Sequence, residues 1–254
     1  MRSFRIIPRL DIKQGYLIKG VQMEGWRKVG PPEVFAKKYY EAGADEILLM
    51  DVVASLYGRN SLHELIKSVC SDIFIPVTVG GGIRTVDDAY SVFACGADKI
   101  SLNTAAIANP EFIAELAKTF GSQAVVISLE VGIVNGAYQV LTDNGRNLTN
   151  RDPITWAKQA EALGAGEVLL SNIVTDGTGK GFDIGLIKDI CDAVTIPVVT
   201  GGGFGDNTHF HDLITQTDVS GMTVANFLHW EKTTIQQIKD SAEHQDVFLR
   251  SAVS

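Results

Sequence analysis

In this sequence of 254 residues, two carboxylates and two glycine runs are the strongest candidates for catalysis and ligand binding. Asp11 and Glu130 each end a short apolar run, and the run GGG occurs at residues 80–82 and 201–203. Two carboxyl groups facing one substrate suit general acid–base work. A glycine turn directly after a strand lets backbone N–H groups approach an anion closely. The pattern therefore predicts acid–base chemistry on a substrate with anionic ends.

The two glycine runs belong to a longer repeat. Each run follows an Ile-Pro-Val segment, IPVTV at residues 75–79 and IPVVT at residues 196–200, with an offset of 121 residues. GADEILL at residues 43–49 and GAGEVLL at residues 164–170 have the same offset. Equal offsets in independent segments indicate an internal duplication of about half the chain.

Both halves alternate short apolar runs with amphipathic stretches, which is the βα pattern. We expect strands at residues 4–10, 46–51, 75–79, 99–102, 124–130, 167–172, 196–200 and 220–224, and helices that include residues 32–42, 61–71, 86–95 and 153–163. Eight such units predict a (β/α)8 barrel. It would be one domain, residues 1–254, built from half-barrels 1–121 and 122–254. An open doubly wound sheet is the alternative, but the duplication favours closure.

In such a barrel the active site lies at the carboxyl ends of the strands. One phosphate socket is expected from Gly82, Asn103 and Thr104, and a second, opposite socket from Gly203 with the turn at Ala225 and Asn226. Glycine runs that merely permit tight turns are the alternative for both sockets. Likewise, Asp11 or Glu130 could instead cap a turn or pair with a lysine such as Lys19. Strand ends also carry Ser171 and two weaker candidates, Asp51 and Asp176, because aspartate there often fixes a loop.

Composition narrows the possible partners. The net charge of −8 leaves no broad basic surface for nucleic acid or an anionic membrane. No apolar run has the length of a signal peptide or a membrane span, and three scattered cysteines suit a cytoplasmic protein. His209 and His211 do not complete a ligand set, so we expect no metal and no cofactor.

Several segments resemble the cyclase family of imidazole glycerol phosphate synthase: RIIPRLDIK at residues 5–13, LIKGV at 17–21, VGGGIR at 79–84, GADKISLNTAA at 96–106, FGSQ at 120–123 and DGTGKG at 176–181. The resemblance covers essentially the whole chain. It implies ammonia-dependent conversion of PRFAR, a substrate with a phosphate at each end, to imidazole glycerol phosphate and AICAR. A sister isomerase of histidine biosynthesis shares the duplicated barrel, but the KGV and FGSQ segments favour the cyclase.

The resemblance also implies residue roles. Asp11 and Glu130 would be the general acid and base, and Lys19 would lie on a mobile loop, residues 12–30, that covers the site. The first phosphate would bind at Gly82, Asn103 and Thr104. The second would bind at Asp176, Gly177, Gly203, Ala225 and Asn226, while Asp51 and Ser171 would lie beside the substrate.

A separate glutaminase is the implied partner, docked at the amino-terminal face of the barrel as the source of ammonia. The family gates the ammonia passage with four charges, which correspond to Arg5, Glu46, Lys99 and Glu167 here. All four are expected at the starts of strands, where two positive and two negative charges could pair as a closed ring. Solvated charges at strand starts are the alternative.

Departures from the family pattern gather at the catalytic face. Glu130 and Val174 stand where the family has aspartates, Gly132 replaces a lysine, Arg9 a cysteine and Asn226 a serine. A second hypothesis therefore remains open, in which the chain delivers ammonia from a glutaminase to a third enzyme that amidinates a surface sugar. A cyclase needs a working acid–base pair, whereas an ammonia conduit needs the gate and the docking face.

Overall fold

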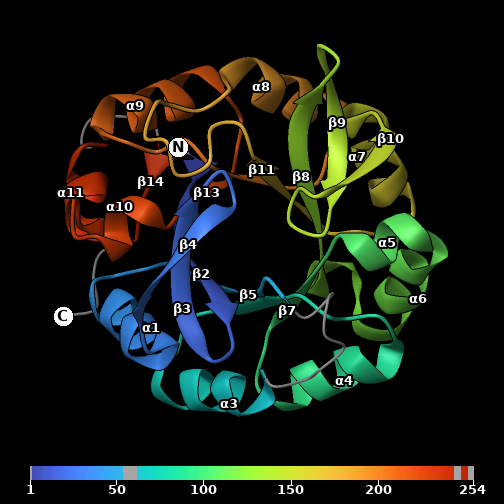
Figure 1. The fold of residues 1–254 in the computed structure, drawn as a ribbon, viewed down its shortest axis with the longest axis horizontal. Coiled ribbons are helices and arrows are strands. Elements are labelled where there is room, and N and C mark those ends of the chain that lie inside the picture. Colours follow the sequence, from blue (N-terminus) through green and yellow to red (C-terminus); the bar gives the residue numbers. More distant parts are fainter. Residues whose placement is uncertain (1, 54–61, 243–246, 251–254) are drawn as a thin grey trace.

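The computed structural model describes residues 2–53, 62–242 and 247–250. Its centre is a closed parallel sheet of eight strands: β2 (Arg5–Lys13), β5 (Ile47–Asp51), β6 (Val77–Gly80), β7 (Lys99–Leu102), β8 (Val125–Val134), β11 (Glu167–Asn172), β12 (Val198–Gly201) and β13 (Gly221–Val224). Neighbours pair in that order, and β13 returns to β2 with Gly221 opposite Arg5 and Val224 opposite Pro8. The expected (β/α)8 barrel is confirmed (Figure 1).

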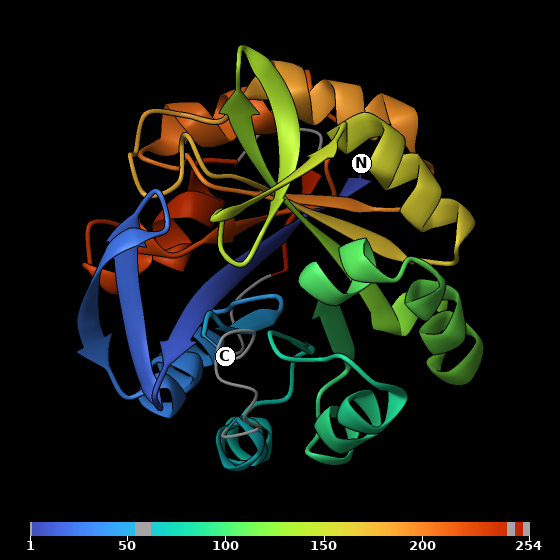
Figure 2. The ribbon, with the colours of Figure 1, turned by 45° about the vertical axis from the view of Figure 1, so that its right-hand side comes forward.

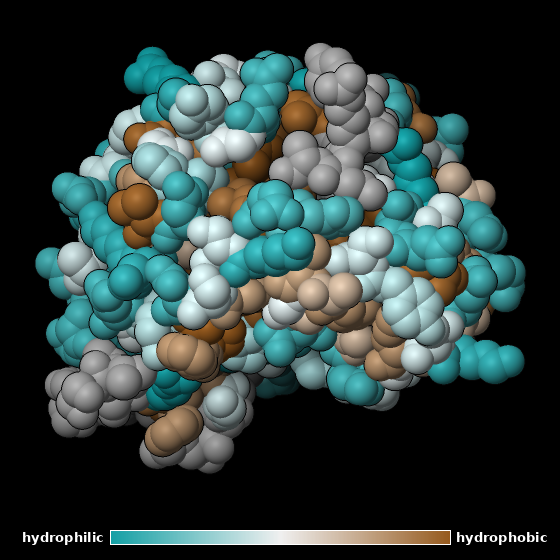
Figure 3. Space-filling view, turned by 90° about the horizontal axis from the view of Figure 1, so that it is seen from below, coloured by the Kyte–Doolittle hydropathy of each residue, from teal (hydrophilic) through white to brown (hydrophobic). Residues whose placement is uncertain are grey.

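Helices surround the barrel (Figure 1): α1 (Pro32–Glu41), α3 (His63–Asp72), α4 (Val86–Ala94), α6 (Glu111–Phe120), α7 (Pro153–Ala162), α8 (Ile184–Ala193), α9 (Asn207–Gln216) and α11 (Ile235–Asp240). Their starts follow local sequence signals. Pro32 and Pro153 occupy first-turn positions, and the side chains of Thr85 and Asp206 accept hydrogen bonds from the first turns of α4 and α9. The outer face seen in Figure 3 is mostly hydrophilic with scattered apolar side chains. None of the described helices has the length and apolar character needed to cross a bilayer.

The main core fills the layer between strands and helices, where Phe4, Trp156 and Phe210 are almost fully buried. A second, smaller apolar cluster lies inside the barrel. Side chains alternate along a strand, so every second residue points inward. On β2 the inward residues are Arg5, Ile7, Arg9 and Asp11, while Ile6 and Leu10 belong to the outer core together with Phe4, which directly precedes the strand.

The two halves repeat each other at the glycine runs. Gly81 and Gly202 both have positive φ, +98° and +85°. A Cβ at Gly81 would lie 2.2 Å from the carbonyl oxygen of Asp51, and a Cβ at Gly202 would lie 2.7 Å from that of Asn172. Asp51 and Asn172 are the last residues of equivalent strands, 121 positions apart. The backbone therefore repeats the duplication seen in the sequence.

Two hairpins extend the barrel beyond the expected strands. β2 runs on to Lys13 and pairs with β3 (Tyr16–Val21), which pairs with β4 (Glu24–Gly30). β8 runs four residues past Glu130 and pairs with β9 (Ala137–Thr142), which pairs with β10 (Asn147–Arg151). Both hairpins stand out from the barrel (Figure 2). Two short helices, α5 (Thr104–Ala108) and α10 (Asn226–His229), follow β7 and β13, and β1 (Arg2–Ser3) pairs with β14 (Val247–Phe248).

Candidate active site

The carboxylates Asp11 and Glu130 both point into the mouth of the barrel from strands of opposite halves. Asp11 lies on β2 and Glu130 on β8, and both side chains are buried. A buried carboxyl group keeps its charge only where hydrogen bonds or opposite charges compensate for the lost water. The partners of each therefore decide its protonation.

Asp11 is surrounded by cations. The Nε–H of Arg9 donates to Oδ1 of Asp11 at 2.8 Å, and Nζ of Lys19 lies 3.6 Å from Oδ2. Burial alone would raise the pKa of Asp11, but the charges of Arg9 and Lys19 outweigh burial and hold the pKa below its ordinary value. Asp11 is therefore a carboxylate at neutral pH.

Glu130 has a different environment. Its Oε2 accepts a hydrogen bond of 3.1 Å from the backbone N–H of Gly145, in the turn between β9 and β10. Burial raises the pKa of Glu130 to about 7, although the nearby charge of Arg9 and the Gly145 N–H oppose the shift. At neutral pH the mouth thus holds one ionised carboxylate and one carboxyl group close to its midpoint. Such a divergence is typical of an acid–base pair.

Lys19 enters the mouth from the β3–β4 hairpin and ties that hairpin down. Its Nζ donates to both carboxylate oxygens of Asp176, at 3.1 and 3.0 Å. Gln22 reinforces the contact, because its backbone N–H donates to the Asp176 carbonyl at 2.8 Å and its side chain to the Val174 carbonyl at 2.8 Å. The predicted covering loop is thus a hairpin that rests on the loop after β11.

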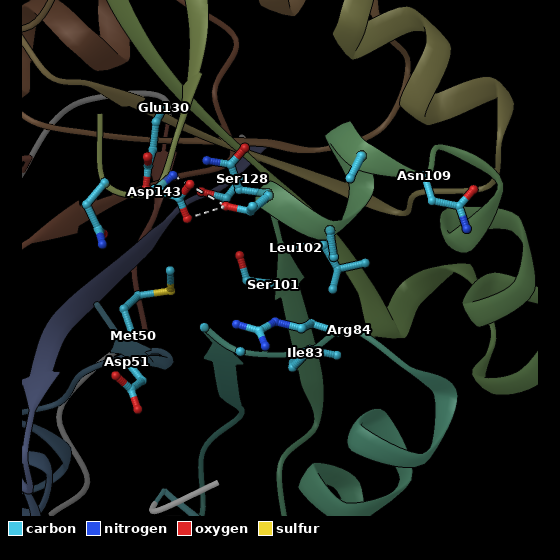
Figure 4. A pocket seen from close by; sticks show the side chains of 17 residues that line it. Met50, Asp51, Ile83, Arg84, Ser101, Leu102, Asn109, Ser128, Glu130 and Asp143 are labelled. Carbon is cyan, nitrogen blue, oxygen red and sulfur yellow. Dashed lines mark hydrogen bonds between the residues drawn. The ribbon is translucent and has the colours of Figure 1, made fainter. Parts of the chain in front are cut away.

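The first predicted socket lies beside a cavity of about 480 Å3. Gly82, Asn103 and Thr104 line it together with Glu130, and Figure 4 shows Ser101 and Arg84 pointing toward its middle. Ser101 Oγ and Asn103 Oδ1 are buried and have no hydrogen-bond partner among the described residues. Unpaired buried polar atoms lining a cavity indicate a place for a polar ligand.

Asp143 occupies part of this socket. It comes from the β9–β10 turn, and its backbone N–H and its Oδ1 lie 3.3 and 3.4 Å from Oγ1 of Thr104 (Figure 4). A carboxylate this close to Thr104 would repel an anion bound there.

The second predicted socket is narrower, about 20 Å3. Its lining includes the residues predicted from the sequence, Asp176, Gly177, Gly203, Ala225 and Asn226, together with Arg9 and Lys19. The Asn226 side chain donates to the Gly177 carbonyl at 3.2 Å. A phosphate would therefore enter only after Lys19 and the hairpin move.

Two other predicted residues, Asp51 and Ser171, make hydrogen bonds within the mouth of the barrel. Asp51 Oδ1 accepts the backbone N–H of Val53 at 3.0 Å, as expected of an aspartate that fixes a loop. Ser171 Oγ accepts from Nη1 of Arg9 at 3.1 Å. His209 and His211 lie in the first turns of α9. Within the described residues, no three His, Cys, Asp or Glu side chains form a group that could hold a metal ion.

Four charges close the opposite end of the barrel. Arg5 Nη1 lies 2.9 Å from Glu46 Oε2, Lys99 Nζ lies 2.9 Å from the same oxygen and 2.8 Å from Glu167 Oε2, and Arg5 also pairs with Glu167. Charges of alternating sign therefore form a continuous ring. Thr78 Oγ1 adds a hydrogen bond to Glu46.

Sequence reasoning missed two contributions to this site. Asp143 and Gly145 were not expected, although Asn135-Gly136 and Asn144-Gly145 are common hairpin-turn pairs that could have indicated the β8–β9–β10 extension. Arg9 was recognised as unusual, but its contacts with Asp11 and Ser171 depend on the barrel geometry.

Comparison with known proteins gives two matches. The family model described as histidine biosynthesis protein matches residues 5–234. The imidazole glycerol phosphate synthase subunit HisF of Legionella pneumophila is 52% identical over 212 residues, which are 83% of this chain and 100% of that protein. The family match spans the barrel from the first residue of β2 to the start of α11.

Proposed function

From the premise that this chain belongs to the histidine biosynthesis protein family, which the match over residues 5–234 and the HisF relative establish, we propose that it is an ammonia-dependent cyclase. It would convert PRFAR and ammonia to imidazole glycerol phosphate, AICAR and water. The observation that carries the proposal is the pair of buried carboxyl groups, Asp11 and Glu130, whose pKa values diverge in one mouth.

Asp11 would act as the general base and Glu130 as the general acid. Addition of ammonia to a carbonyl carbon requires a proton to leave the nitrogen and a proton to reach the departing oxygen. An ionised Asp11 suits the first task, and Glu130, with a pKa of about 7, can supply the second proton. Lys19, which lies between Asp11 and Asp176, would move to the substrate when the hairpin opens and closes.

The two glycine loops would hold the two phosphates. Gly82, Asn103 and Thr104 would bind one end, and Asp176, Gly177, Gly203, Ala225 and Asn226 the other. The short helices α5 and α10 start at these loops, so the backbone N–H groups of their first residues would be available as hydrogen-bond donors to the phosphates. Asp51 and Ser171 would lie beside the substrate between the sockets.

A glutaminase at the amino-terminal face would supply the ammonia. The ring of Arg5, Glu46, Lys99 and Glu167 lies at that end of the strands and would gate the passage. Neutral ammonia would pass a ring of paired charges more readily than ammonium, because ammonium loses far more solvation free energy when it leaves water and the ring's carboxylates are already paired with Arg5 and Lys99.

The Arg9–Asp11 ion pair favours a second candidate, the ammonia-delivery partner. At 2.8 Å the guanidinium occupies one oxygen of the carboxylate that a cyclase needs as its base. In that function the barrel conducts ammonia to another enzyme above its mouth and does not turn over PRFAR.

The experiment is turnover of PRFAR by the purified chain with excess ammonium salt at pH 8 and no glutaminase. Release of AICAR together with imidazole glycerol phosphate would support the cyclase. Binding of PRFAR without turnover would contradict the proposed acid–base pair. If PRFAR does not bind at all, the ammonia-delivery partner becomes the better explanation.

A further inference from the structure

The β9–β10 turn, residues 143–146, contacts the first predicted socket and Glu130 at the same time. We propose that Asp143, in this turn, is a positioning residue through which an anion in that socket controls the proton on Glu130. Where the anion is a substrate phosphate, this role rests on the proposed function. The contacts of the turn are properties of the free chain, so they can be tested without turnover.

The contact between the turn and the socket is weak. The backbone N–H of Asp143 donates to Oγ1 of Thr104 at 3.3 Å, and the same hydroxyl donates to Oδ1 of Asp143 at 3.4 Å. Ordinary N–H···O and O–H···O hydrogen bonds measure about 2.9 Å and about 2.7 Å. A doubly charged anion accepts shorter hydrogen bonds and repels the Asp143 carboxylate, so at Thr104 it would replace this contact.

The turn is compact enough to move as a unit. Asp143 has left-handed backbone, with φ of +52°, and Gly145 follows with φ of +78°. The backbone N–H of Arg146 donates to the Thr142 carbonyl at 3.0 Å and closes the turn. Nδ2 of Asn147, the first residue of β10, donates to Oδ2 of Asp143 at 2.5 Å, so the carboxylate is tied to the hairpin. A displacement of Asp143 is therefore transmitted to Gly145.

Glu130 depends on the same turn, because its Oε2 accepts the 3.1 Å hydrogen bond from the Gly145 N–H. The nearby groups that act on its charge are the guanidinium of Arg9, the carboxylates of Asp11 and Asp143, and this N–H. The other charged side chains that line the cavity are Asp51 and Arg84 (Figure 4). Burial raises the pKa of Glu130 most, and the Gly145 N–H lowers it by more than the Asp143 carboxylate raises it. Withdrawal of the whole turn therefore raises the pKa of Glu130.

Binding of an anion would thereby place the proton that the general acid needs. In the free chain the pKa of Glu130 is about 7, so the carboxyl group is close to its midpoint at neutral pH. An anion at Thr104 would withdraw the Gly145 N–H and add its own negative charge, and both changes favour the protonated form. The coupling must be reciprocal, so protonation of Glu130 would tighten the binding of the anion.

Removal of the Thr104 hydroxyl tests the coupling without any ligand. Thr104→Val deletes the group that both contacts of Asp143 share, so the turn should withdraw. In NMR spectra, the amide hydrogen of Gly145 should exchange with solvent at least tenfold faster, and the carboxyl carbon of Glu130 should titrate at higher pH. Thr104→Ser keeps the hydroxyl and should match wild type. Equal exchange and equal titration in all three proteins would overturn the role of the turn.

Sulfate is the probe for the anion, because it stays doubly charged between pH 5 and pH 8. The amide signals of Gly82 and Asn103 report its binding in the socket. At pH 8, saturating sulfate should speed exchange of the Gly145 amide hydrogen in wild type at least tenfold. In Asp143→Asn, sulfate should bind at least threefold more tightly and leave Gly145 in place, since the repelling charge is gone. Asp192→Asn, which removes an exposed carboxylate on α8, should match wild type.

Three results of the sulfate experiment would overturn the proposed role of Asp143. Sulfate that binds wild type and leaves Gly145 unchanged would show that the turn does not respond to the anion. An equal response of Gly145 in Asp143→Asn would show that the charge of Asp143 has no part in the response. Failure of sulfate to bind the wild-type socket would show that Asp143 is not displaced by an anion, whether or not Asp143→Asn binds it.

Turnover of PRFAR with ammonium gives a separate test that depends on the proposed function. Asp143→Asn should lower KM, because the repulsion is gone. At pH 8 it should lower kcat at least threefold, because Glu130 keeps the Gly145 N–H and stays more ionised in the complex. At pH 6 kcat should match wild type, since Glu130 is protonated in both proteins.

A purely structural role of Asp143 would lower kcat by the same factor at pH 6 and pH 8, and that result would overturn the positioning role. A wild-type chain that makes no product from PRFAR would contradict the proposed function instead. The two NMR experiments would then still decide whether the turn couples the socket to Glu130.

Discussion

Replacement of Glu130 by glutamine is expected to change how the stability of the protein depends on pH. Burial raises the pKa of Glu130 from 4.5 to about 7 in the folded chain. Between these pH values the folded state keeps a proton that the unfolded state has released. The free energy of unfolding of the wild type therefore contains a contribution that is fully present below pH 4.5, falls as the pH rises, and is lost above about pH 7.

The size of this contribution follows from the shift. Each pKa unit corresponds to about 1.4 kcal/mol, so a displacement from 4.5 to about 7 amounts to about 3 kcal/mol. Glutamine does not titrate. Its amide oxygen can still accept the Gly145 N–H, and any cost of burying the amide group is the same at every pH. The stability of Glu130→Gln relative to wild type should accordingly rise by about 3 kcal/mol between pH 4.5 and pH 8.

Urea unfolding at pH 5, 6, 7 and 8 measures this slope. Glu161→Gln on α7 is the matched control, because the hydrogen bond from Thr195 lowers the pKa of Glu161 from 4.5 and the stabilising contribution of that carboxylate is lost only as the pH falls below this value. The control difference should be flat over the same range. A pH-independent difference for Glu130→Gln would show that Glu130 is ionised in the folded state, and the acid–base assignment would fail with it.

Three further predictions concern turnover and backbone space. Asp11→Asn should lower ammonium-dependent turnover by at least a hundredfold while the Kd for PRFAR stays within threefold, and a parallel loss of binding would mean a structural role. With the glutaminase present, Lys99→Met should raise the ratio of glutamate released to AICAR formed at least twofold, because it opens the charged ring. Lys118→Met, at an exposed helix position, is the control. Equal ratios in the two variants would refute the gate. Gly202→Ala should lower the free energy of unfolding, measured in urea, by about 2 kcal/mol more than Gly136→Ala does. Gly136 is the control because it also has positive φ but a Cβ there would have no neighbour within 4 Å. An equal loss in the two variants would refute the clash with Asn172.

Much of the fold was predictable because the sequence is duplicated, so each strand of one half supports the position of the equivalent strand in the other half. Equal offsets locate equivalent strands, and the barrel strands lie within two residues of their expected starts. The ends of β2 and β8 were wrong, since Asp11 and Glu130 lie inside long strands and not at their last residues. Hydrophobic periodicity did not predict these extensions, because the alternation of apolar residues ends where each hairpin leaves the barrel. The Asn135-Gly136 pair was the sequence signal that could have predicted the turn after β8.

The site was predictable in position but not in protonation. Both carboxylates were expected at the mouth, but nothing in the sequence indicated that their pKa values would shift in opposite directions. Their difference arises because Arg9 extends toward Asp11 and Ser171, while Glu130 reaches a backbone N–H on a hairpin. Which side chain a buried arginine meets depends on the twist and tilt of eight strands, which no local pattern specifies.

The strand β2 gives the two ends of the barrel a shared mechanical element. One uninterrupted nine-residue strand carries Arg5 of the ring, Arg9 and Asp11 of the mouth, and Lys13, whose pairing with Tyr16 starts the β3–β4 hairpin. Opening of the hairpin and the proposed docking of a glutaminase at the opposite face would therefore act on the same segment. Any coupling between them must be reciprocal: a partner that tightens substrate binding by some factor is itself held more tightly, by that same factor, once the substrate is bound.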